Sequence, residues 1–254
     1  MKPLPVSKPN TWEFLRDPMI APTGFREYDA RWKYPQEINL PGMTALGLGL
    51  GTQMWKRGIE PVIAVGNDYR DYSLAIKNAL ILGLMQAGIH VKDIGPALSP
   101  MAYFSQFYLD APAVAMVTAS HNPNGWTGVK MGFERPLTHG PDEMAELKNI
   151  VLNGEGETRE GGRYEFVDGV KEAYLDDLVG DFRISRPLKI VCATGNGTAS
   201  AFAPEVLKRM GVEVVPLHNE LDYTFPNYNP NPEDMEMLHD MAHACLLYTS
   251  PSPR

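Results

Sequence analysis

Cysteine is scarce in this chain of 254 residues, which contains only Cys192 and Cys245. Two thiols cannot build the dense disulfide framework of small secreted domains, so a reducing compartment fits the composition. Long apolar runs are also missing. No stretch approaches the roughly 18–20 residues that a membrane-spanning helix needs, and the N-terminus shows no apolar run of secretory length. These absences predict a cytoplasmic protein without a membrane partner.

Positive charge is in short supply as well. Lysine and arginine number 23 against 31 acidic residues, which gives a formal net charge of −8. An acidic chain gives no reason to expect nucleic-acid binding, which usually needs a basic surface. An anionic substrate would therefore have to be held by a few locally placed Lys and Arg side chains.

What is present is ordinary for a globular protein, with 44% hydrophobic and 21% charged residues. Strand-like and helix-like segments alternate along most of the chain, which predicts an α/β architecture. Short apolar runs predict buried strands at 61–65, 91–94, 113–117, 188–192 and 212–216. Helical patterns cover 41–58, 73–88, 101–108, 142–152, 167–179 and 202–210. We expect an extended lead-in over 1–24, a strand or loop over 25–31 and a solvated loop or hairpin over 153–163.

The strand–helix–strand pattern restarts near residue 188, which predicts two domains. We expect a first domain over residues 1–165 and a partial second domain over residues 166–244. The last ten residues, 245–254, become rich in Ser and Pro and lack any periodicity. Our hypothesis is that they are a non-native tail on a truncated reading frame.

One short segment gathers the residues that could carry chemistry. The string TASHNPNG, residues 118–125, follows the apolar run AVAMV, and ligands in open α/β sheets bind at the carboxyl ends of strands. Ser120 offers an oxygen nucleophile, and His121 and Asn122 offer hydrogen-bond donors beside it. Lys130 follows on the expected returning strand and could supply positive charge to a phosphate. The segment therefore suits a serine that holds a phosphoryl group.

The longer string TASHNPNGWTGVK resembles the active-site loop of the α-D-phosphohexomutases, in the bacterial phosphomannomutase/phosphoglucomutase type. The resemblance continues in FREYDAR, in the turn VGNDYR and in ATGNGTAS, and it covers roughly residues 22–243. It implies a three-layer α/β/α first domain with a mixed sheet, followed by a truncated second α/β domain.

The resemblance also implies an activity, the interconversion of hexose 1-phosphates and hexose 6-phosphates of mannose and glucose. The enzyme's phosphoserine gives its phosphoryl group to the sugar, and a bisphosphorylated sugar returns the other group to the serine. Mg²⁺ is the implied cofactor, glucose or mannose 1,6-bisphosphate is the activator and intermediate, and a phosphorylated hexose is the partner. The implied catalytic residues are Ser120, His121, Lys130 and Arg31, and the implied substrate-binding residues are Tyr28 and Asn122.

This sequence departs from the family pattern in two ways. Trp32 stands where the family usually has Gly, and Ala30 where it usually has Ile, so we expect altered packing around Arg31. The Asp-Gly-Asp-x-Asp-Arg string that holds Mg²⁺ in the family is not in the chain. The phosphate of Ser120 is then the only metal ligand that the resemblance leaves here, and we expect the chain alone to be inactive as a mutase.

Alternatives remain open at this point. The chain could act as a non-catalytic fragment or as a module that binds sugar phosphates. A nucleotide site is a weaker alternative, because the glycines of 47–51 follow no strand and more simply allow close helix packing. A serine hydrolase is also weaker, because the strained Gly-x-Ser-x-Gly elbow is absent.

Overall fold

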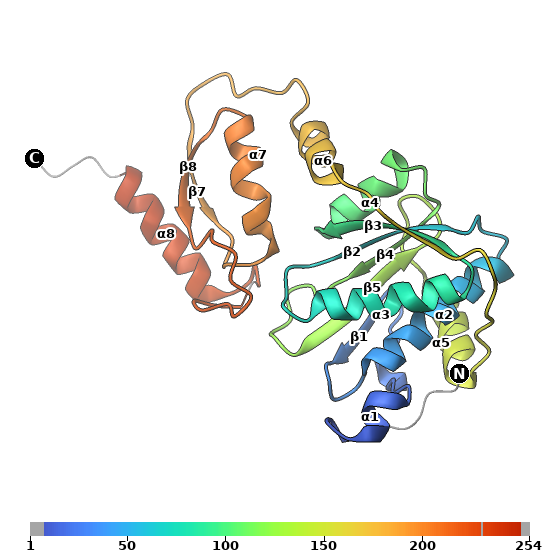
Figure 1. Cartoon of the computed structure of the whole chain (residues 1–254). Helices are drawn as coiled ribbons and strands as arrows, with labels where there is room; N and C mark the ends of the chain where they lie inside the picture. The colour runs from blue at the N-terminus through green and yellow to red at the C-terminus, as the bar shows by residue number, and fades with distance from the viewer. Residues whose placement is uncertain (1–7, 230, 250–254) are drawn as a thin grey trace, which may run out of the picture. The chain divides into compact units, whose positions relative to one another are not determined.

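The computed structural model describes residues 8–229 and 231–249, which form two compact units. The first unit comprises the described residues up to Ala119 together with Gly125–Lys171. The second comprises Ser120–Asn124 and the described residues from Glu172 onward. Figure 1 shows a mixed sheet with helices in the first unit and a smaller strand pair with helices in the second.

A six-stranded mixed sheet organises the first unit, in the order β1-β5-β4-β2-β3-β6. The strands β4, β2, β3 and β6 run parallel, whereas β5 is antiparallel to both of its neighbours. The carboxyl ends of β2 and β4 therefore meet at one edge of the sheet. The strands are β1 Ala30–Lys33, β2 Val62–Asn67, β3 His90–Pro96, β4 Ala113–Val117, β5 Trp126–Gly132 and β6 Arg163–Phe166.

Helices cover both faces of this sheet. On one face α2 packs against α3 and α5, and their apolar side chains share a core with alternate residues of the strands. On the other face α4 packs on β2 and β4 (Figure 1). The helices are α1 Trp12–Arg16, α2 Leu40–Lys56, α3 Ser73–Gln86, α4 Ser99–Tyr108 and α5 Pro141–Asn153, with a 3-10 turn at Pro22–Gly24. The expected α/β fold with a mixed sheet is confirmed.

The glycines of α2 allow unusually close helix packing. A Cβ at Gly47 would collide with the carbonyl oxygen of Leu80, and a Cβ at Gly83 would collide with that of Thr44. Backbone therefore meets backbone where α2 and α3 cross, which only glycine permits. The packing interpretation of this glycine-rich stretch is confirmed.

The second unit is built on a parallel pair of strands, β7 Lys189–Ala193 and β8 Glu213–Leu217, joined through α7 Ala203–Arg209. This is the expected strand–helix–strand unit. Arg209 forms ion pairs with Glu172 and Asp176 and so ties α7 to α6, which spans Val170–Val179. The unit also contains a 3-10 turn at Thr198–Ala201 and the helix α8, Met235–Thr249.

Three sequence expectations differ from the structure. The lead-in is not wholly extended, because the helix α1 forms within it. Thr11 caps this helix, and the side chain of Asn39 donates hydrogen bonds to the carbonyl oxygens of Phe14 and Asp17. The strand β6 follows the loop of 153–163 and pairs with β3, so the sheet of the first unit extends to Phe166. The helix α8 continues through Cys245 to Thr249.

Some expectations fall outside the described residues, namely those for residues 1–7 and 250–254. The origin of the segment 245–254 stays a hypothesis. Within the described part of the chain, no helix combines the length and the apolar character needed to cross a membrane.

Candidate active site

The loop that carries Ser120 connects β4 to β5 at the carboxyl edge of β4. Ser120 has a φ of 57° and Gly125 a φ of 87°, both in the left-handed region. Glycine adopts this region freely, but a serine does so at a cost in conformational energy. Such backbone conformations persist only where the surroundings enforce them, and they concentrate at functional sites.

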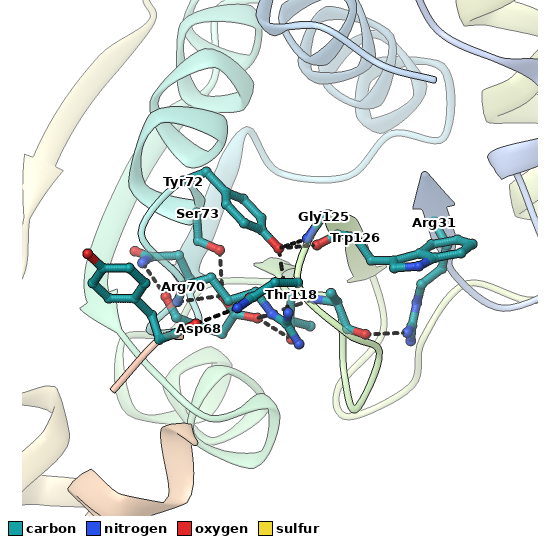
Figure 2. A network of polar contacts seen from close by, with 12 residues as sticks. Arg31, Asp68, Arg70, Tyr72, Ser73, Thr118, Gly125 and Trp126 are labelled. Atoms are coloured by element: carbon teal, nitrogen blue, oxygen red, sulfur yellow. Dashed lines mark hydrogen bonds and ion pairs between the residues drawn. The ribbon is translucent and has the colours of Figure 1, made fainter. Parts of the chain in front are cut away.

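The first end of this loop is held by Asp68, which follows β2. One carboxylate oxygen of Asp68 accepts hydrogen bonds from the hydroxyl of Thr118 (2.9 Å) and the backbone N–H of Ala119 (3.2 Å). The other oxygen accepts from the hydroxyl of Ser73 (2.5 Å) and from the backbone N–H of Arg70 (3.3 Å). Figure 2 shows Asp68 at the centre of these contacts. Asp68 is buried, and the guanidinium of Arg70, 3.3 Å away, neutralises its charge.

The second end of the loop is held by Tyr72, from the same turn between β2 and α3. Its hydroxyl accepts a hydrogen bond from the N–H of Gly125 (3.1 Å) and donates one to the carbonyl oxygen of Trp126 (2.8 Å). Figure 2 shows the Tyr72 side chain reaching across to these two residues. Its ring stacks on Tyr34 with centroids 5.6 Å apart, and the Tyr34 N–H bonds the Gly125 carbonyl oxygen.

Arg31 on β1 contacts the residue that precedes Ser120. Its guanidinium donates a hydrogen bond to the carbonyl oxygen of Ala119 (2.8 Å) and pairs with Asp29 at 2.6 Å. Its Nε is buried and has no hydrogen-bond partner among the described residues. A buried donor without a partner is costly in a native structure and calls for an explanation. The predicted site residue Arg31 is thus placed beside the Ser120 loop.

Ala30 and Trp32, the two departures from the family pattern, face the opposite side of β1 from Arg31. Ala30 and Trp32 belong to the apolar core, whereas Arg31 lies between them and, by the alternation of a strand, faces the opposite side. The indole N–H of Trp32 bonds the carbonyl oxygen of Ala21, and its ring meets Phe25 edge-on. Gly24 makes room for that indole, since a Cβ there would overlap it. Both departures therefore lie on the core side of β1, and altered packing stays a prediction.

Lys130 lies on the returning strand β5, as expected. Its backbone pairs with Met116 on β4, and Gly128 on the same strand pairs with Arg31, so Lys130 and Arg31 project from the same face of the sheet. Gly128 has a Cβ position blocked by the carbonyl oxygen of Ala30, which explains the second glycine of the motif. Lys130 makes no hydrogen bond or ion pair to a described side chain, so it remains available for an anion.

The remaining predicted residues are more exposed. His121 and Tyr28 are exposed and form no side-chain hydrogen bond within the described part of the chain, and Asn122 is partly exposed on the loop. The structure thus joins Arg31 to the loop base. The roles of His121, Tyr28 and Asn122 toward a substrate stay predictions.

The arginines around the loop base each form an ion pair with a carboxylate, whereas Lys130 does not. Arg31 is paired with Asp29 and Arg70 with Asp68, whereas no carboxylate among the described residues neutralises Lys130. Burial raises the pKa of Tyr103 on α4, and the charge of Asp29 raises it further, so α4 lies near this ion pair. Lys130 is therefore the cation beside the loop base that can attract an anionic ligand.

Sequence reasoning did not select the residues that hold the loop. No role is predicted from the sequence for Asp68, Arg70, Tyr72 or Ser73. The signal was present in VGNDYR, the turn similar to a family turn. Its link to the serine loop was not visible, because Asp68 and Thr118 are separated by 50 positions.

The residues present do not form a complete magnesium site. The described part of the chain contains no group of three or more His, Cys, Asp or Glu side chains placed to hold a metal ion. The loop TASHNPNG carries no carboxylate, and Asp29 and Asp68 at its base each form an ion pair with an arginine. Mg²⁺ prefers several oxygen ligands in octahedral geometry.

Together, the fold and the loop define an α/β/α protein that presents a serine on a rigid loop at the carboxyl edge of a mixed sheet. Residues 22–157 match the family model described as phosphoglucomutase/phosphomannomutase, alpha/beta/alpha domain I, and residues 166–246 match that of domain II. The chain belongs to the phosphoglucomutase/phosphomannomutase family.

Individual relatives support this assignment. The phosphomannomutase/phosphoglucomutase of Pseudomonas putida is 33% identical over 217 residues, which cover 85% of this chain and 46% of that protein. The phosphomannomutase of Salmonella typhimurium is 33% identical, with 90% of this chain and 51% of that protein covered. A crystal structure of a family protein from Burkholderia thailandensis superimposes with a TM-score of 0.82 at 30% identity, covering 89% of this chain and 50% of that one. The chain thus spans about half the length of the relatives it matches.

Proposed function

We propose that the protein containing this chain interconverts hexose 1-phosphates and hexose 6-phosphates, and that Ser120 carries the transferred phosphoryl group. The observation that carries the proposal is the left-handed backbone of Ser120 on a loop fixed at both ends, in a chain of this family. A rigid loop suits phosphoryl transfer, because that reaction depends mainly on positioning and charge stabilisation.

The proposed step uses residues of this chain in defined roles. A sugar hydroxyl oxygen attacks the phosphorus of phosphoserine and passes its proton to a base, while the bond to the Ser120 Oγ breaks and that oxygen takes up a proton to become the serine hydroxyl. The second half reverses the order, so the other phosphate of the bisphosphorylated sugar returns to Ser120. Lys130 and Arg31 supply positive charge to the equatorial oxygens, and His121 contacts substrate oxygens or handles the proton. Mg²⁺ would add charge neutralisation when bound, although the described residues of this chain do not complete a site for it.

A second candidate function rests on the same observations. Lys130, which no described carboxylate neutralises, favours a module that binds sugar phosphates without turning them over. Binding without phosphorylation of Ser120 would distinguish it from the mutase.

A coupled assay of the full gene product tests the proposal, with glucose 1-phosphate and mannose 1-phosphate as substrates. We expect Ser120→Ala to lower kcat by about a thousandfold or more, because the phosphoryl carrier is lost. Ser105→Ala is the matched control, since the Ser105 hydroxyl bonds the Ala102 carbonyl oxygen within α4. Equal turnover of the Ser120→Ala and wild-type enzymes would refute the proposal.

A further inference from the structure

We propose that Asp68 and Tyr72 are positioning residues, which grip the two ends of the serine loop from a single turn and so hold Ser120 in its left-handed conformation. This inference rests on the proposed function for its catalytic consequence. Its structural part, that the turn sets the loop conformation, stands on the contacts alone.

The grip comes from one short turn. Asp68 and Tyr72 lie only four positions apart between β2 and α3, yet Asp68 bonds Thr118 and Ala119 while Tyr72 bonds Gly125 and Trp126. The turn is anchored to the sheet, since the Asp68 N–H bonds the carbonyl oxygen of Val117. Both ends of the loop are therefore hydrogen-bonded to the same turn between β2 and α3 (Figure 2).

The chemistry of Asp68 cannot be replaced by an amide. Both of its oxygens accept hydrogen bonds, one from Thr118 and Ala119 and the other from Ser73 and Arg70. Asparagine has a single acceptor oxygen, and its NH₂ group would face donors. Asp68→Asn therefore loses the hydrogen bonds that one of the two carboxylate oxygens accepts, while the shape of the side chain changes very little.

The chemistry of Tyr72 is separable from its packing. Its ring stacks on Tyr34, but its contact with the loop is made by the hydroxyl. Tyr72→Phe removes the two hydrogen bonds to the loop, together with the 3.5 Å hydrogen bond that the Arg70 guanidinium donates to the hydroxyl, and keeps the ring. Tyr34→Phe is the matched control, because the Tyr34 hydroxyl forms no hydrogen bond to a described residue while its ring belongs to the same stacked pair.

Backbone hydrogen exchange tests the grip without any assay of activity. We expect a peptide covering residues 118–126 to exchange about tenfold faster in Tyr72→Phe and Asp68→Asn than in the wild type. Tyr34→Phe should exchange like the wild type. Asp93→Asn controls for the loss of a buried carboxylate, because Asp93 pairs with Lys77 and Tyr164 away from the loop; it should lower Tm without loosening the 118–126 peptide.

Single-turnover transfer from phosphorylated Ser120 in the full gene product tests the catalytic consequence. We expect Tyr72→Phe and Asp68→Asn to slow transfer about 10- to 100-fold at saturating hexose phosphate, with little change in KM, because a misplaced phosphoryl group on Ser120 costs rate more than binding. Thr118→Ser, which keeps the hydroxyl, should retain most of the rate that Thr118→Val loses.

The outcomes separate the two proposals. If the wild-type enzyme carries no phosphate on Ser120, the proposed function fails, and the exchange data alone decide whether the grip exists. If Tyr72→Phe matches Tyr34→Phe and Asp68→Asn matches Asp93→Asn in loop exchange, the positioning role is overturned.

Discussion

At the scale of single residues, the fit between Trp32 and Gly24 shows how a departure from the family pattern is accommodated. Trp32 is fully buried, bonds the Ala21 carbonyl oxygen and fills the space that a side chain at position 24 would need. The larger residue on β1 and the missing side chain on the neighbouring turn form a complementary pair. The face that carries Arg31 is left unaltered.

Gly24→Ala should therefore destabilise the protein by about 1–3 kcal/mol through overpacking. Urea unfolding of the single variant, of Trp32→Leu and of the double variant forms a double-mutant cycle. We expect the double variant to lose less stability than the sum of the two single losses, because a smaller residue at position 32 makes room for the new methyl group. Strict additivity would show that the two positions are not coupled.

At the scale of elements, the contact between α2 and α5 depends on a buried histidine. His139 precedes α5, and its Nε2 lies 3.0 Å from the side-chain oxygen of Gln53 on α2. The Gln53 amide nitrogen donates to Glu143 and Glu146, so its oxygen is left to accept from the imidazole. Burial lowers the pKa of His139 to about 4, so the ring is neutral at pH 7.

This element contact should make stability depend on pH. The unfolded chain binds a proton at an ordinary histidine pKa near 6.5, whereas the folded chain resists protonation down to about 4. Stability should therefore be full above pH 6.5 and fall as the pH drops toward 4, by at most about 3 kcal/mol from this group. Urea unfolding at pH 7 and pH 5 measures the difference.

His139→Gln should flatten part of that slope, because the titrating group is gone. Met144→Ala, a change to a buried apolar residue of α5, is the control and should lower stability equally at both pH values. An unchanged slope in His139→Gln would contradict the assignment.

The crossing of α2 and α3 allows a second prediction at this scale. Gly83→Ala should lower the free energy of unfolding by about 3 kcal/mol or more, because its Cβ would collide with backbone that cannot move aside. Gly58→Ala is the comparison: it has open space and a φ of 67°, so it should cost only about 1–2 kcal/mol for the left-handed conformation. Chemical denaturation of both variants checks the order, and a smaller loss in Gly83→Ala would argue against close packing.

The elements that could be predicted from the sequence are those whose pattern of apolar and polar residues lies within the element itself. Helices such as α2 and the strand β4 show their own periodicity, and the serine loop is contiguous in TASHNPNG. The helix α1 was missed because it has only five residues and depends on Asn39, more than one element away. The strand β6 was missed because all four of its residues are exposed and show no alternation. The hydrogen bond between Thr118 and Asp68 could not be predicted from the sequence, because only the fold brings these two distant residues together.

At the scale of the whole molecule, the chain spans about half the length of its curated relatives. It holds the serine loop, but its described residues offer no metal-binding cluster. We therefore expect this chain alone to show no Mg²⁺-dependent turnover in a coupled assay from glucose 1-phosphate to glucose 6-phosphate. Appreciable turnover would mean that the residues described here suffice for catalysis.

The central claim is that Ser120 is the phosphoryl carrier, and phosphopeptide mass spectrometry tests it most directly. The full gene product would be incubated with glucose 1,6-bisphosphate and Mg²⁺, digested and mapped, with Ser120→Ala treated in parallel. We predict one phosphorylated peptide, containing residues 118–126 with the phosphate on Ser120, and its loss in the variant. Phosphate found only on other residues, or retained in Ser120→Ala, would contradict the account.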